Sequence, residues 1–326
     1  MKYLYRPSLI WLLALLVITQ GCSTFRPALN SDDNTNNYCA VPHQLFISDT
    51  LQTNKAASLQ MHDTNTLTGL SYRSRQLTHA YGFDHGLRLL GQMGIGLTPK
   101  SPAYPAFLKQ RKAIVSQIVE ASGDVLRVAE ELECEKQRAE QSAIALQRRE
   151  DKQRNNLTVG SLLLGAASGT ISATVKNPDL NLVLTVSTAV LSAALGVATI
   201  FVNPQINYPI SQNLLADVWY QHPRSALYPP GLWVVLNEER TGRSDGNVTS
   251  LLQTARKRWT QYDQLTNGKP RQQAQQQKLF FGAGGGYHVD DLHTLSNMLT
   301  EIEVVVRLIN QDLQKLLAEV SNFEPQ

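Results

Sequence analysis

The chain has 326 residues, of which 42% are hydrophobic and 17% charged, and 30 lysines and arginines against 27 acidic residues give it a formal charge of +3. This apolar content excludes a mostly disordered chain. The nearly balanced charge argues against nucleic acid as a partner, because nucleic-acid-binding proteins usually carry a strongly basic surface. The length allows one large or two medium domains.

A short basic segment and a run of apolar residues open the sequence. Lys2 and Arg6 precede the run Leu9–Ile18, which would span only about 15 Å as a helix, half of a bilayer core. Such a run is typical of a secretory signal peptide rather than of a membrane anchor. It is followed by Gly21 and then by Cys22.

This small residue directly before a single cysteine resembles the lipobox of bacterial lipoproteins. The resemblance covers the signal segment only, and Thr19 stands where these sequences commonly have leucine. It implies a lipoprotein signal peptide over residues 1–21 and acylation of Cys22, and Ser23 resembles a signal for sorting to the outer membrane of Gram-negative cells. Residues 22–38 are rich in Asn, Asp, Ser and Thr, which predicts a flexible tether. The alternative is an ordinary secretory signal with an incidental cysteine.

The two other cysteines are Cys39 and Cys134. In an exported protein the surroundings are oxidising, so a disulfide between these two residues is favoured over a pair of unpaired, buried thiols. No spacing of cysteines and histidines suggests a metal site. Residues 39–104, which contain many glycines and prolines, are expected to form mixed short helices and loops.

Two heptad patterns predict long amphipathic helices. Within residues 105–155, a stripe from Val115 to Leu146 recurs at alternating spacings of three and four, interrupted only by polar Ser122 and Lys136. Within residues 290–322, nine large aliphatic residues repeat in the same way. We expect both helices to pack in a mainly α bundle, with a free coiled-coil stalk as the alternative.

Two charge-free apolar runs lie between these patterns. Leu157–Val175 has 19 residues and Leu182–Val202 has 21, and each is long enough to cross a bilayer. Residues 156–203 are therefore predicted to form a hydrophobic helical hairpin, with the alternative that both helices are buried in a soluble core. Small residues spaced by four let helices approach closely in lipid. The residues expected to make such contacts are Ser161, Gly165, Gly169, Ala173, Thr188, Ser192 and Gly196.

Residues 204–289 are predicted to be a region of helices and loops, with one helix over 248–265. At its end the glycine-rich run 282–286 precedes a cluster that could ligate a metal, formed by His288, Asp290, Asp291 and His293. We instead expect Asp290 to cap the last helix and the glycines to allow a sharp turn or hinge. Because motifs for phosphate binding, HExxH or a nucleophile elbow are missing from the sequence, we expect no catalytic residues, no metal and no cofactor beyond the lipid on Cys22.

The sequence thus predicts a mainly α, non-enzymatic protein, lipid-anchored at the outer membrane of a Gram-negative envelope. It would associate with itself or with an envelope partner through the hairpin. The order of long helix, apolar hairpin and long helix is similar to that of cytolysin A-type α-helical pore formers, which implies a pore, channel or secretion-related assembly as one version. The alternatives are a monomeric, periplasm-facing helical binding module with the hairpin buried as core, and a metal-dependent enzyme using His288, Asp290 and His293.

Overall fold

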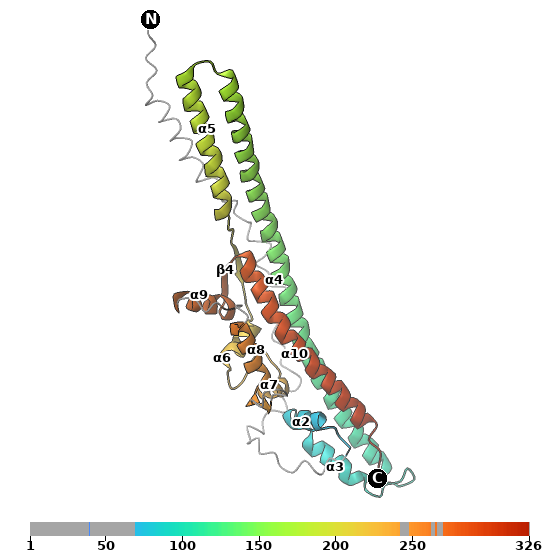
Figure 1. Ribbon diagram of the computed structural model, residues 1–326. Helices are drawn as coiled ribbons and strands as arrows, with labels where there is room; N and C mark the ends of the chain where they lie inside the picture. Colours follow the sequence, from blue (N-terminus) through green and yellow to red (C-terminus); the bar gives the residue numbers. More distant parts are fainter. Residues whose placement is uncertain (1–38, 40–68, 242–247, 262–264, 266–269, 326) are drawn as a thin grey trace. The chain divides into compact units, whose positions relative to one another are not determined.

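The computed structural model describes Cys39 and residues 69–241, 248–261, 265 and 270–325 (Figure 1). These residues are mainly helical, which confirms the predicted fold class. The predicted signal peptide, residues 1–21, and the predicted tether, residues 22–38, lie outside the described residues. The elements are α2 (Tyr72–Ala80), α3 (Asp84–Gly94), α4 (Tyr104–Thr174), α5 (Pro178–Ala198), the 3₁₀ turn η4 (Thr199–Phe201), β1 (Ile206–Pro209), α6 (Leu214–Tyr220), α7 (Pro230–Asn237), β2 (Arg240–Thr241), β3 (Val248–Thr249), α8 (Leu251–Gln261), α9 (Pro270–Phe281), β4 (Gly284–Tyr287) and α10 (Val289–Ser321).

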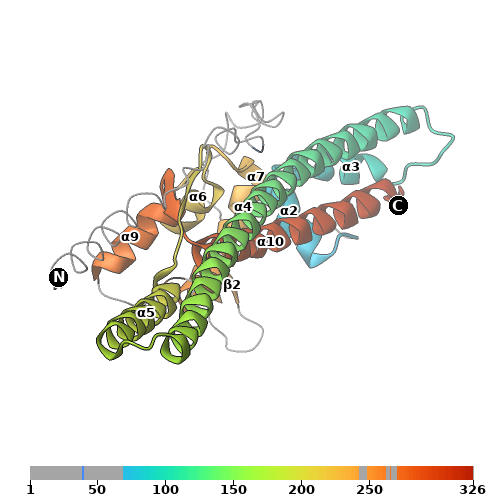
Figure 2. The same ribbon diagram turned by 90° about the horizontal axis from the view of Figure 1, so that it is seen from above.

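Helices α4 and α10 lie side by side and run in opposite directions, as the views in Figures 1 and 2 both show. All nine aliphatic residues of the second heptad pattern, from Leu292 to Val320, are buried. On α4, burial follows the predicted stripe from Ile118 to Leu146. The two patterns therefore form a bundle core and not a free stalk, because each apolar stripe is covered by the other helix and by its neighbours.

The two polar interruptions of the α4 stripe have specific partners on α10. The Ser122 hydroxyl donates to Asn310 Oδ1 at 2.6 Å and accepts from Gln314 Nε2 at 2.7 Å. The Lys136 ammonium lies 2.7 Å from Glu303 Oε2. Since a shift of one helix along the other would separate these groups, the polar pairs fix the register of the bundle.

Helix α4 continues far beyond residue 155, where the sequence analysis ended the first long helix. It has 71 residues and runs without a break into the first apolar run. The segment from Arg148 to Asn156 is polar, but it contains neither proline nor glycine, so the intrahelical hydrogen bonds continue through it. The change of composition near residue 147 marks the end of the contact with α10 rather than the end of a helix.

A two-stranded antiparallel sheet joins the end of the hairpin to the start of α10. Strand β1 pairs with β4, with Ile206 opposite Tyr287 and Pro209 opposite Gly284. Gly284 has a φ of +82°, and an added Cβ would lie 2.2 Å from the Tyr208 carbonyl oxygen. The glycine-rich run therefore forms a strand instead of the predicted turn or hinge, because only glycine allows this close approach to β1.

The shorter helices cover one side of the α4–α10 pair. The predicted helix over 248–265 is shorter in the structure, because Val248 lies in β3 and the Ser250 hydroxyl accepts a hydrogen bond from the Gln253 amide at the start of α8. Leu252, Ala255 and Trp259 of α8 are buried on its inner face. Helix α3 packs against α4, α2 and α8 pack against α10, and α6, α7 and α9 pack on these shorter helices.

Cys39 and Cys134 form a disulfide that connects the N-terminal region to the middle of α4. Their Cα atoms are 5.6 Å apart, and 95 positions separate them in the sequence. Closing so long a loop restricts the unfolded chain, and the chain-entropy model assigns about 4–5 kcal/mol to such a link. The bond places residue 39 beside the bundle, well before the point where the hairpin begins.

Candidate functional site

The apolar hairpin, defined as residues 157–201, consists of the last part of α4, the helix α5 and η4 (Figure 1). The turn between its two limbs follows from local chemistry. Asn177 caps α5 by accepting hydrogen bonds from the Asp179 and Leu180 amides at 3.2 and 3.4 Å, and Pro178 occupies the first helical position. Proline suits that position because its missing N–H has no partner there in any case.

Two serines connect the limbs, because each donates its hydroxyl to the backbone carbonyl of the other. The Ser161 hydroxyl donates to the Ser192 carbonyl at 2.9 Å, and the Ser192 hydroxyl donates to the Ser161 carbonyl at 2.8 Å. An added Cβ at Gly165 would lie 3.5 Å from Ser192 Oγ, and one at Gly196 would lie 3.7 Å from Ser161 Oγ. Small residues on both limbs therefore allow the close approach that this reciprocal pair of hydrogen bonds requires.

The structure places the small residues predicted to pack on two different faces. Ser161, Gly165, Ser192 and Gly196 lie at the contact between the limbs, and Thr188 is half-buried there. Gly169 and Ala173 are exposed, and an added Cβ at Gly169 would meet nothing within 4 Å.

The exposed position of these two residues has a geometric cause. A spacing of four residues advances around a helix by about 40° more than a full turn, so a strict fourfold repeat leaves the contact face after two steps. The observed contacts of this limb are made by Ser161, Gly165 and Ser172, and the step of seven residues from Gly165 to Ser172 returns to nearly the same face of the helix.

Near the turn, the contact between the limbs depends on a residue that the sequence analysis missed. The Asn181 amide donates to the Ser172 and Val175 carbonyls at 3.2 and 3.1 Å. Its carbonyl oxygen accepts from the Thr185 hydroxyl at 3.0 Å. One feature of the sequence could have indicated this role. Asn181 directly precedes a long apolar run, where an amide without hydrogen-bond partners would be costly.

Every hydroxyl group of the hairpin makes a hydrogen bond within the hairpin or to Arg154 just before it. Most of them donate to a carbonyl three or four residues earlier in the same helix, as serine and threonine do in membrane helices. The eleven residues are Thr158, Ser161, Ser168, Thr170, Ser172, Thr174, Thr185, Ser187, Thr188, Ser192 and Thr199. None of these side chains therefore depends on water for a hydrogen-bond partner.

The outer surface of the hairpin is apolar, and none of the described residues covers it. Both of its helices are long and apolar enough to cross a membrane, and no residue of either apolar stretch is buried. Thirteen large apolar side chains are exposed: Val159, Leu162, Leu163, Leu180, Leu182, Val183, Leu184, Val186, Val190, Leu191, Val197, Ile200 and Phe201. Among the described residues, the buried positions of α4 end at Leu146, and α5 has none, so the bundle helices do not cover the hairpin.

A buried polar cluster holds the returning chain against α4. Arg138, only 2% exposed, pairs with Glu135 at 2.8 Å and donates to the Pro209 carbonyl at 3.0 Å. The Arg138 guanidinium also lies 4.0 Å from the centre of the Tyr208 ring. Burial, and then the Glu135 carboxylate, raise the pKa of Tyr208, so its phenol stays protonated and donates to Glu135. These contacts fix where β1, and with it the hairpin, joins the bundle.

Glu131, one turn before Glu135 on α4, makes the stability of the bundle depend on pH. Burial and the neighbouring Glu135 raise the pKa of Glu131 from 4.5 to about 7, and Arg127 opposes this only in part. Between these pH values the folded chain binds more protons than the unfolded chain, so its free energy of unfolding falls as the pH rises.

We expect Glu131→Gln to remove the fall in the free energy of unfolding that Glu131 causes as the pH rises. This fall is about 1–2 kcal/mol once solvent screening at this half-buried site is allowed for. Urea denaturation of the variant and the wild type at about pH 5 and about pH 8, on either side of the shifted pKa, measures the effect. The variant should gain stability relative to the wild type only at the higher pH. An equal difference at both pH values would contradict the assignment.

The histidine and aspartate cluster at the start of α10 forms a helix cap. The His288 amide donates to Asp291 Oδ2 at 3.0 Å, so Asp291, and not the predicted Asp290, is the capping acid. The His288 ring lies 3.1 Å from the Pro204 carbonyl and 2.6 Å from Gln205 Nε2, which binds it to the chain that follows the hairpin. Among the described residues, no group of three or more His, Cys, Asp or Glu side chains is arranged to hold a metal ion.

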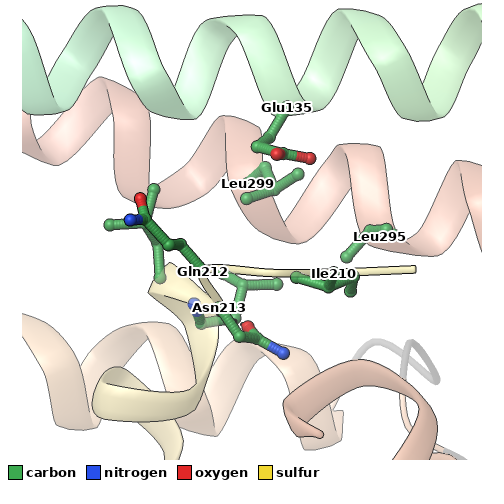
Figure 3. A pocket seen from close by; sticks show the side chains of 8 residues that line it. Glu135, Ile210, Gln212, Asn213, Leu295 and Leu299 are labelled. Carbon is green, nitrogen blue, oxygen red and sulfur yellow. Dashed lines mark hydrogen bonds between the residues drawn. The ribbon is translucent and has the colours of Figure 1, made fainter. Parts of the chain in front are cut away.

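A small recess lies where the chain after β1 passes alongside α4 and α10. Figure 3 shows Glu135 from α4 and Leu295 and Leu299 from α10 facing Ile210 and Asn213. Its volume is about 10 Å³, which is enough for about one water molecule. This recess is therefore too small to bind an organic ligand.

Comparison of the chain with protein-family models, with curated proteins and with solved structures finds no match in any of the three.

Proposed function

We propose that this chain is a non-enzymatic envelope protein, held at a membrane by acyl chains on Cys22, that inserts the apolar hairpin into a lipid bilayer. The observation that carries the proposal is the pair of charge-free limbs with no buried side chain. Soluble proteins rarely expose contiguous apolar patches larger than a few hundred Å² unless the patch contacts a protein or a membrane. Transfer of the thirteen exposed apolar side chains from water into hydrocarbon supplies the driving force.

The dimensions of the hairpin agree with those of a bilayer. The α5 helix has 21 residues and is about 31 Å long, and the limb over 157–174 is about 27 Å long. The hydrocarbon core of a typical bilayer is about 30 Å thick. Charged residues occur only at the two ends of the limbs, with Lys176 in the turn, Asp179 in the first turn of α5 and Arg154 at the base.

The internal hydrogen bonds support a hydrocarbon environment over a protein partner. Inside a bilayer, each polar group must find its partner within the protein, because no water is present. All eleven hydroxyls and the Asn181 amide already meet this condition within residues 154–201. A partner protein could supply missing hydrogen bonds, but the hairpin leaves none of these side chains to be satisfied.

The position of the disulfide is compatible with one membrane for both the lipid and the hairpin. Cys134 precedes Leu157 by 23 residues, about 35 Å along α4. The 17 residues from Cys22 to Cys39 reach at most about 55–60 Å. An acyl chain on Cys22 can therefore lie in the same bilayer that receives the hairpin.

Trypsin provides a test, because Lys176 is the only site at which it can cut between Arg154 and Arg224. We expect purified chain from residue 22 onward, carrying Cys22→Ala, to be cut after Lys176 in solution. Added liposomes should protect Lys176, which the hairpin carries across the bilayer, while Lys100 remains accessible. Detergent should restore cleavage after Lys176. Equal cleavage with and without liposomes would reject insertion, and release of a trapped dye would separate a pore from a simple anchor.

A further inference from the structure

We infer that the basal segment, residues 148–154 of α4, binds the phosphate headgroups of anionic phospholipids. The inference rests on the proposed insertion of the hairpin, because insertion brings this segment to the membrane surface. The segment ends three residues before Leu157, where the apolar run begins. A side chain at this level of an inserted hairpin lies among lipid headgroups and not in hydrocarbon.

The cations of this segment outnumber its acids. It contains Arg148, Arg149, Lys152 and Arg154 against Glu150 and Asp151. The chain that returns from the hairpin brings no further acid to this level, since residues 202–205 are Val, Asn, Pro and Gln. Of the two acids at the nearby start of α10, Asp291 is engaged as the helix cap and Asp290 is exposed.

One of the cations, Arg154, has a structural partner, and two of the other three are exposed. Arg154 pairs with Glu150 at 2.5 Å, and its guanidinium donates to the Val202 carbonyl at 3.4 Å, which links the two limbs at the base. Arg148 and Lys152 are exposed on the same side of the helix, one turn apart, and Arg149 is half-buried. Within the part of the chain that the structure describes, no ion pair joins these three residues to an acid.

The chemistry of this surface fits an anionic bilayer. Arginine side chains bind phosphate oxygens through paired N–H groups, and lysine binds them as a point charge. A basic residue near an anionic membrane contributes about 1 kcal/mol, or a factor of about five in affinity. With three available cations against two remaining acids, Asp151 and Asp290, we expect anionic lipid to strengthen binding roughly fivefold.

Vesicle flotation tests the inference with the chain from residue 22 onward carrying Cys22→Ala. Affinity is measured for vesicles of phosphatidylcholine alone and for vesicles that also contain phosphatidylglycerol. The test variant combines Arg148→Gln, Arg149→Gln and Lys152→Gln. The matched control combines Lys100→Gln, Lys109→Gln and Lys112→Gln, which removes the same charge from exposed positions before and at the start of α4.

We expect phosphatidylglycerol to strengthen binding of the wild type and of the control, and high salt to abolish this increase. The test variant should lose the increase but keep protection of Lys176 at saturating lipid. Equal responses of the wild type and the test variant to phosphatidylglycerol, or an equal loss in the control, would overturn the inference while leaving insertion intact. Failure of every chain to protect Lys176 in either vesicle would reject the insertion itself.

Discussion

Val190→Asp weakens the partition of the apolar hairpin into liposomes by about 100-fold, the effect that we expect from one acid at the centre of a membrane-spanning helix. Val190 lies near the middle of α5 and is 62% exposed, so its side chain would face hydrocarbon after insertion. The reason is electrostatic, because an aspartate at this depth loses its hydration and has no cation nearby. Flotation with phosphatidylcholine vesicles, together with protection of Lys176 from trypsin, measures the loss.

The matched control is Val304→Asp on α10. Val304 is also exposed, at 51%, and the chemical change is the same, but the residue lies on the bundle. It should leave partition unchanged. Neither variant should lower the free energy of unfolding in water, because neither side chain is part of a core. Equal partition of the two variants would show that the outer face of α5 does not enter the bilayer.

Arg138→Met is expected to lower the free energy of unfolding by about 3–5 kcal/mol, since it leaves a buried carboxylate without its cation. Glu135 and Arg138 are both almost fully buried. Arg138 also donates a hydrogen bond to the carbonyl of Pro209, the last residue of β1. Urea denaturation followed by circular dichroism measures the loss. The effect should be among the largest of any single substitution in the bundle, because three groups lose a partner together.

The double variant Glu135→Leu with Arg138→Met separates loss of the ion pair from loss of packing. Replacing both members of a buried ion pair with apolar residues of similar volume is often neutral or stabilising. We therefore expect the double variant to regain most of the stability that Arg138→Met loses. A double variant as unstable as the single one would mean that Arg138 acts mainly through Tyr208 and Pro209 and not through Glu135.

The sequence was sufficient to predict the helices of the core. Nine aliphatic residues at alternating spacings of three and four can share one face only in a helix, and all nine are buried in α10. The start of α5 has a signal of the same local kind, because Asn177 and Pro178 are residue types favoured at the N-cap and at the first helical position. Such features depend on neighbours within a few residues, which the sequence displays directly.

Candidate packing residues were harder to predict. A repeat of four identified Ser161, Ser192 and Gly196 but also Gly169 and Ala173, which lie away from the contact between the limbs. The spacing of residues does not show which face of each helix contacts the other limb, because that depends on how far each helix is rotated about its axis. That rotation depends on both limbs at once, and Asn181 was missed for the same reason.

The helical character, the apolar stripes and the two long charge-free stretches can all be predicted from the order of the residues. The three-dimensional arrangement adds that no described residue covers these stretches, that α4 runs unbroken from the bundle into the hairpin, and that Gly284 belongs to a strand beside Tyr208. These additions could not be predicted because periodicity and composition are local properties of the chain. Burial depends instead on which distant segments meet. Here α10 begins at Val289, directly after β4, and the buried core extends no further toward the apolar hairpin.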